Sequence, residues 1–157
     1  MQEAGGAGLI DPLPFPTTDQ VLAGTGKERK RIMDKERTVK FTLNGEEMER
    51  RFPTNLSLLN ALRYELGATE VKNGCEKGDC GACVGGVDGL AENTCCMLAV
   101  QADGKALRTV KGMGSVDSLH PLQQAFIEVG AIQCGFCTPG MLCAAEAFLT
   151  EYPKPTR

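Results

Sequence analysis

The sequence predicts an α+β fold, in which a small domain of short strands is followed by a helical segment. Apolar and polar residues alternate from Val39 to Leu43, and Asn44-Gly45 follows, a pair typical of a tight hairpin turn. After Gly114 the apolar residues recur at the spacing of a helix instead. This change of period divides the chain into a strand-rich part and a helical part.

The strand-rich part continues after the hairpin turn. We expect a return strand over 46–52, ended by Pro53, and then a helix that Asn55 or Ser57 caps and that runs to Leu66. Further short strands are expected at 84–88, 91–94 and 106–110, joined by Gly-containing turns.

Two helices are expected in the C-terminal part. Pro121 is suited to the first turn of one, and Thr138-Pro139 combines a cap with a first-turn proline for the other. The residues expected to face a core are Leu119, Leu122, Phe126 and Val129 in the first helix and Leu142, Ala145 and Leu149 in the second.

Composition excludes several classes of function. The net charge of −3 gives no reason to expect a nucleic-acid partner. No apolar run has the length of a membrane span, and no secretory signal begins the chain, so we expect a cytoplasmic protein. Residues 1–36 are rich in Gly, Pro and charge and are expected to form a flexible tail, a linker or an arm on a partner subunit.

The chain contains 8 cysteines, an unusual number for its 157 residues. In a reducing compartment so many thiols favour metal binding over disulfides. Because the compartment is itself inferred, a disulfide framework remains an alternative.

Three of these cysteines lie in the sequence KNGCEKGDCGAC. Cys75, Cys80 and Cys83 have the C-x4-C-x2-C spacing of a plant-type [2Fe–2S] site, with Cys95 or Cys96 following at a distance. The glycines among them allow φ > 0 and a close approach of backbone N–H groups to the sulfurs. A structural zinc site is the alternative, although His120 is the single histidine.

A second cysteine pair, Cys134 and Cys137, precedes the second expected helix. A helix N-terminus favours negative charge on thiolates. Cys143 falls inside that helix, where a small buried cysteine usually packs. Cys95 and Cys96 are adjacent, and the spacing alone does not decide between them.

With both cysteine groups in place, the chain closely resembles the small iron–sulfur subunit of the molybdenum hydroxylases, the xanthine dehydrogenase and nicotinate dehydrogenase family. The stretches that carry this resemblance span roughly residues 38–157; they are FTLNGE, VKNGCEKGDCGACVGGVDG, TCCMLAVQADG, HPLQQAFIEVGAIQCGFCTPGM and YPKPTR. The resemblance implies a β-grasp, plant-type ferredoxin-like [2Fe–2S] domain over 37–113. It also implies an all-helical [2Fe–2S]-binding domain over 114–157.

The resemblance also implies the roles of individual residues. Gln133 matches a glutamine that contacts the pterin of the molybdenum cofactor, which a separate large subunit holds. His120 is expected to be structural, at the start of a helix. The first cluster is assigned to Cys75, Cys80, Cys83 and Cys95, and the second to Cys134 and Cys137.

Two departures from the family pattern matter. Residues 84–86 are VGG where the family has Thr and β-branched residues, so we expect a bulge in that strand. The family completes the second cluster with a C-x-C pair further along, whereas 20 residues follow Cys137 here. We therefore expect a truncated or fragmentary chain, with an incomplete helical domain whose second site lacks two ligands.

The function implied is electron transfer, with no catalytic residue in this chain. Single electrons would pass from the molybdopterin centre of the large subunit towards FAD on a flavin subunit, during hydroxylation of a small, N-heterocyclic substrate. The rival interpretations are a free-standing ferredoxin-like carrier that uses the first cluster alone, and a zinc-bound structural module. Purification with or without partner subunits distinguishes the carrier, and a visible absorption spectrum distinguishes the zinc module.

Overall fold

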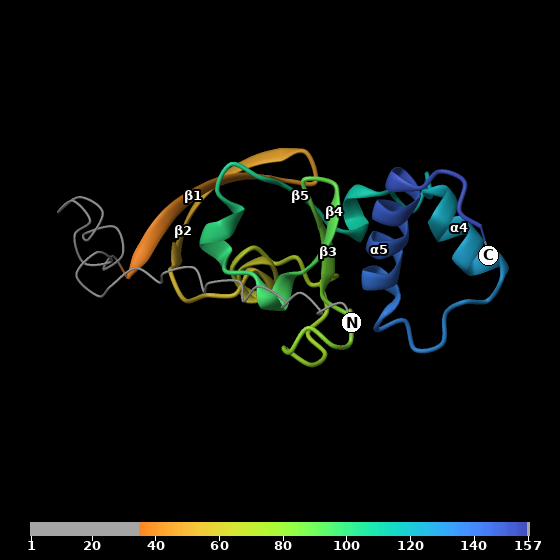
Figure 1. Ribbon diagram of the computed structural model, residues 1–157, viewed down its shortest axis with the longest axis horizontal. Coiled ribbons are helices and arrows are strands. Elements are labelled where there is room, and N and C mark those ends of the chain that lie inside the picture. The colour runs from red at the N-terminus through yellow and green to blue at the C-terminus, as the bar shows by residue number, and fades with distance from the viewer. Residues whose placement is uncertain (1–34, 157) are drawn as a thin grey trace, which may run out of the picture. The chain divides into compact units, whose positions relative to one another are not determined.

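The computed structural model describes residues 35–156, which form a mixed five-stranded sheet with two helices, α4 and α5, beyond its last strand (Figure 1). The α+β prediction is confirmed. The predicted tail, residues 1–36, lies outside the described residues except for its last two positions. Strand β1 (Glu36–Leu43) begins slightly earlier than expected, and the Glu36 carboxylate pairs with Arg51 Nε at 2.9 Å.

The hairpin is confirmed where the Asn-Gly pair predicts it. β1 pairs antiparallel with β2 (Glu46–Pro53), and Asn44 and Gly45 have φ angles of 53° and 90° at the turn. β1 also pairs in parallel with β5 (Ala106–Arg108), so the sheet order is β2-β1-β5-β3-β4. The centre of the sheet is therefore made by strands that are distant in the sequence.

The predicted bulge in β3 (Val84–Val87) is wrong. β3 pairs residue for residue with β4 (Leu90–Asn93), without an extra residue on either strand. The two glycines serve close approach instead, because a Cβ on Gly86 would stand 3.3 Å from Arg108 Cβ, and one on Gly85 would stand 3.4 Å from the Arg108 oxygen. Small residues thus let β5 lie tightly against β3.

The helix expected after Pro53 is present but irregular. Ser57 caps it, with Oγ accepting from Asn60 N–H at 3.2 Å, and a short α-helical segment α3 (Leu58–Asn60) continues as a π-helix η1 (Ala61–Glu65). Its buried leucines complete a core under the sheet with residues of β1 and β5. The 3-10 turns η2 (Thr94–Cys96) and η3 (Ala99–Ala102) connect β4 to β5, and a further turn, η4 (Val110–Gly112), follows β5.

The two C-terminal helices begin where the prolines predict. α4 covers Pro121–Glu128 and α5 covers Thr138–Glu151, although Cys137 rather than Thr138 is the N-cap residue of α5. α5 packs against β3 and β4 and lies between the sheet and α4 in Figure 1. A second, smaller core consists of Met113, Leu142 and Cys143, with Leu122 and Phe126 packed against it.

The expected apolar face of α4 is only partly correct. Leu119 precedes the helix and is 40% exposed, and Val129 follows the helix and is 76% exposed. Gly130, with φ 65°, turns the chain away just after α4 ends, so Val129 does not continue the helical face. Leu142 is buried in the second helix, whereas Ala145 and Leu149 are half-buried.

Among the helices of residues 35–156, none has both the length and the apolar character that crossing a bilayer requires.

Candidate metal centre

Three of the predicted ligands, Cys75, Cys80 and Cys83, lie in the loop between η1 and β3. Gly78 has a φ angle of 81°, in the left-handed region that glycine adopts without strain. Gly74 is required for space instead, because a Cβ there would stand 2.7 Å from Cys80 Sγ. This loop, residues 72–83, is called the first cysteine loop below.

Within the loop, backbone N–H groups, including that of Cys80, point at the Cys75 thiol. Cys75 Sγ accepts from the backbone N–H groups of Lys77 at 3.4 Å and Cys80 at 3.5 Å. These N–H dipoles, Cys80 first, lower the pKa of the Cys75 thiol to about 7, because they stabilise the thiolate. A thiolate, rather than a thiol, is the form that ligates metal.

Cys83 ends the first cysteine loop, and Cys95 lies in the neighbouring turn η2. Cys83 is buried, and Thr94 Oγ1 donates to its carbonyl at 2.8 Å, which fixes η2 beside the loop. Burial raises the pKa of both thiols. The backbone N–H of Gly78 partly opposes this rise at Cys95, because it favours the thiolate. Asn93 Nδ2 donates to the Gly78 carbonyl at 3.3 Å and ties β4 to the loop.

The four thiols fit a two-iron cluster in donor type and in grouping. A [2Fe–2S] cluster takes four thiolates, and the first cysteine loop with η2 offers Cys75, Cys80, Cys83 and Cys95. Within residues 35–156, no three His, Cys, Asp or Glu side chains lie close enough together to hold a single metal ion. Soft thiolates in pairs and N–H groups aimed at sulfur are what such a cluster requires.

Cys96 lies at the same site, although the resemblance assigns it no role. Its side chain is exposed, and its Sγ lies 3.7 Å from Cys95 Sγ. The adjacency of the two cysteines is visible in the sequence, but the sequence does not reveal that both sulfurs reach the first cysteine loop.

The second cysteine pair lies in the loop between α4 and α5. Cys134 and Cys137 are both exposed, and Cys137 is the residue at which α5 begins. Gly135, with φ 78°, makes the turn between them. Gln133 is exposed in the same loop, so its amide is open to a partner.

The second pair lies against the first cysteine loop. A Cβ on Gly74 would stand 3.8 Å from Cε1 of the Phe136 ring, between Cys134 and Cys137. Gly140, in the first turn of α5, lies against Gly81 and Ala82, and a Cβ there would overlap the Gly81 carbonyl. The structure thus brings both cysteine motifs together, and Gly140 is a contributor that sequence patterns did not identify.

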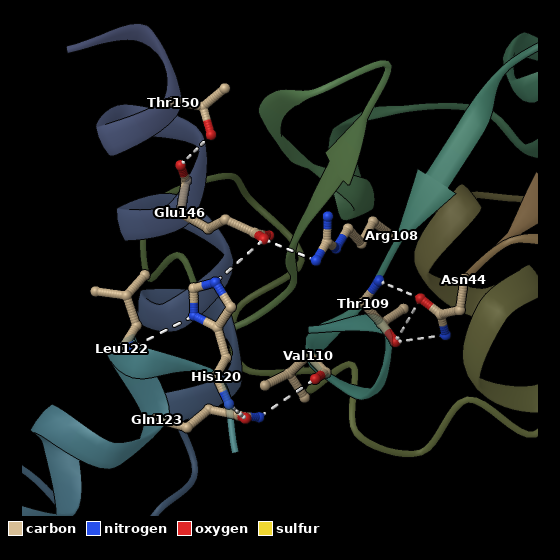
Figure 2. A network of polar contacts seen from close by, with 9 residues as sticks. All are labelled: Asn44, Arg108, Thr109, Val110, His120, Leu122, Gln123, Glu146 and Thr150. Atoms are coloured by element: carbon tan, nitrogen blue, oxygen red, sulfur yellow. Dashed lines mark hydrogen bonds and ion pairs between the residues drawn. The ribbon is translucent and has the colours of Figure 1, made fainter. Parts of the chain in front are cut away.

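An ion pair attaches α5 to strand β5 of the sheet (Figure 2). Arg108 Nη2 lies 2.9 Å from Glu146 Oε1, and His120 Nε2 lies 3.9 Å from the same oxygen. His120 Nδ1 accepts from Leu122 N–H at 3.3 Å and so caps α4, in agreement with the expected structural role.

Cys143 is separate from both cysteine pairs. It is buried in the smaller core, and burial raises the pKa of its thiol to about 11. The expectation that Cys143 packs rather than ligates agrees with this position.

Comparison with known proteins identifies the class. Residues 41–107 match the family described as "2Fe-2S iron-sulfur cluster binding domain". Residues 109–157 match that described as "[2Fe-2S] binding domain". The chain is thus a [2Fe–2S] protein with two cluster-binding regions.

Individual relatives narrow the class. The chain is similar to the nicotinate dehydrogenase small FeS subunit of Eubacterium barkeri, with 45% identity over 119 residues, 76% of each chain. It is 42% identical to the xanthine dehydrogenase iron-sulfur-binding subunit of Escherichia coli O157:H7, over 73% of this chain and 71% of that one. The chain belongs to the iron–sulfur subunits of the molybdenum hydroxylase family, and is a non-catalytic subunit of an oxidoreductase.

The fold agrees with this assignment. A chain of quinoline 2-oxidoreductase from Pseudomonas putida 86 matches with a TM-score of 0.74 and 39% identity, over 78% of this chain and 76% of that one.

Proposed function

We propose that this chain relays single electrons from a molybdopterin centre on a large subunit towards FAD on a flavin subunit. The observation that carries the proposal is the glycine-rich first cysteine loop, where backbone N–H groups are aimed at Cys75 Sγ and Thr94 holds the turn with Cys95 against Cys83. A [2Fe–2S] cluster bound there supplies one-electron redox chemistry. The chain supplies the thiolates, their burial and the hydrogen bonds that set the potential, and no catalytic acid, base or nucleophile.

The first cluster is assigned to Cys75, Cys80, Cys83 and Cys95. The backbone N–H groups of Lys77 and Cys80 support Cys75 as a thiolate. Such hydrogen bonds to sulfur also tune the potential of a cluster. The bond from Thr94 Oγ1 to the Cys83 carbonyl holds η2, which contains Cys95, beside Cys83 and supports the second half of the site.

A second cluster site is assigned to Cys134 and Cys137 in a helical domain over 114–157, after the β-grasp domain over 37–113. The pair supplies two of the four ligands, so the 157-residue chain holds one stable cluster. Contact of Phe136 and Gly140 with the first cysteine loop supports electron passage between the two motifs.

The partner surface is assigned to the helical region. Gln133 is assigned to the pterin of the large subunit, and its exposure leaves it open to that partner. Ile127, Phe136 and Phe148 are 55%, 46% and 50% exposed, and large apolar side chains left exposed can mark a protein contact. A large molybdopterin subunit would cover it.

The substrate class is inferred from the relatives. Those reported above are named for nicotinate, xanthine and quinoline, which are nitrogen heterocycles, although an aldehyde oxidoreductase iron-sulfur-binding subunit of Escherichia coli (strain K12) is also 42% identical. We propose hydroxylation of a small N-heterocycle by the assembled, cytoplasmic enzyme.

Purification of the tagged chain from its own cells tests the proposal. We expect molybdenum and flavin to co-purify, and the visible absorbance of the iron–sulfur centre to bleach when an N-heterocyclic substrate is added without oxygen. The Cys75→Ala variant serves as the control for that bleaching. A chain that purifies alone with its cluster would support a free carrier, and a colourless zinc-bound chain would support a structural module.

A further inference from the structure

Cys96 places a fifth thiol beside the four proposed ligands of the first cluster. Cys96 Sγ lies 3.7 Å from Cys95 Sγ, and a Cβ on Gly78 would stand 2.9 Å from Cys96 Sγ. Cys96 is exposed and belongs to neither core formed by residues 35–156. Packing therefore does not account for this thiol.

The two sulfurs lie only 3.7 Å apart, so a small movement brings either one to the same position. Both cysteines belong to the same short turn, η2, and both reach Gly78: its N–H faces Cys95, and its Cα lies against Cys96 Sγ. Replacing one sulfur by the other thus requires a local change in η2 and no rearrangement of the first cysteine loop.

We propose that Cys96 is an alternative fourth ligand of the first cluster, able to replace Cys95. The inference rests on the proposed function, because it requires that cluster to form. In the exchange, the iron–sulfur bond to Cys95 breaks and one to Cys96 forms. The Cys96 thiol releases its proton to solvent, the freed Cys95 thiolate takes one up, and no electron is transferred.

Anaerobic reconstitution of the full chain with iron and sulfide tests the exchange. We expect Cys96→Ala to retain about two irons per chain with an unchanged spectrum, by the stoichiometry of a [2Fe–2S] site. Cys95→Ala should also retain about two irons, with shifted visible absorption and a shifted reduced-state paramagnetic signal. The double variant should lose at least half of this iron on gel filtration. Cys80→Ala, which has no spare thiol at its position, should lose iron as the double variant does.

Alkylation with iodoacetamide gives a second readout. In loaded Cys95→Ala, Cys96 should be protected relative to the iron-free variant, whereas in the loaded wild type it should remain reactive. Iron loss from Cys95→Ala as complete as from the double variant would overturn the inference, as would an unprotected Cys96. A Cys95→Ala chain that fails to refold also counts against it, because a working replacement ligand would restore the loop. Failure of the wild type to load iron would instead contradict the proposed function.

Discussion

Replacing Gly140 by alanine tests the contact that joins the two cysteine motifs. The new Cβ would overlap the Gly81 carbonyl oxygen and would stand 3.2 Å from the carbonyl carbon and oxygen of Ala82. These are backbone atoms of the first cysteine loop, so they cannot turn aside as a flexible side chain would. Helix α5 or the loop must therefore move.

The expected effect follows from two opposing contributions. Overpacking a tight contact costs about 1–3 kcal/mol, and the backbone overlap places this case at the upper end. Alanine in place of glycine in a helix returns about 0.5–1 kcal/mol. The free energy of unfolding should thus fall by about 2 kcal/mol, which lowers the urea midpoint by about 1 M at a slope of about 2 kcal/mol/M.

Urea unfolding of the loaded chain, followed by circular dichroism, measures this fall. Met141→Ala is the matched control, because Met141 is the next residue and is 47% exposed. The free energy of unfolding of this control should change by less than about 0.5 kcal/mol, as is typical of surface substitutions. A Gly140→Ala midpoint that is unchanged or raised would refute the close approach of α5 to the first cysteine loop.

Three further results are expected. Glu146→Gln should lower the free energy of unfolding by about 0.5–1 kcal/mol, because it breaks a partly buried ion pair with Arg108. Glu49→Gln, in an exposed ion pair with Lys40, is the control and should change that free energy little. Equal effects of the two substitutions would contradict the role of Glu146. In the iron-free chain, the alkylation rate of Cys75 should be half-maximal near pH 7, where its thiolate forms. Cys143, with a pKa of about 11, should stay unreactive at that pH. Equal reactivity of the two thiols would contradict these environments. Hydrogen exchange should be faster in α4 and α5 than in β1 and β2, because the core of the helices is smaller, and equal protection would count against a partner-dependent helical region.

Local patterns predicted the elements of the fold well. The Asn44-Gly45 turn was recognisable because two consecutive residues with positive φ favour this pair, and both adopt it. Pro121 and Pro139 marked the helix starts, because proline fits the first turn. The pairing of β1 with β5 could not be predicted, because no local period encodes which distant strands meet.

Two predictions were wrong, the bulge in β3 and the place of Val129 on the apolar face of α4, because both depend on more than the local sequence pattern. Gly85 and Gly86 suggested a bulge, but they are small because Arg108 crosses close to them. Val129 fits the apolar spacing of α4, yet Gly130 ends the helical course at that point.

For the candidate site, the spacing of Cys75, Cys80 and Cys83 predicted the chemistry, because consecutive ligands in one loop are a local feature. The approach of Cys96 to Gly78 and of Gly140 to Gly81 depends on how separate segments pack. Such contacts are set by tertiary structure and leave no periodic signal in the sequence.

Iron and spectroscopic analysis of the reconstituted 157-residue chain decides whether the first cysteine loop holds a [2Fe–2S] cluster. We expect about two irons per chain and one reduced-state paramagnetic signal, from a cluster on Cys75, Cys80, Cys83 and Cys95. Cys75→Ala should remove both. About four irons with two distinct signals would show that Cys134 and Cys137 complete a second site within these residues. A colourless chain without iron would contradict the electron-transfer function itself.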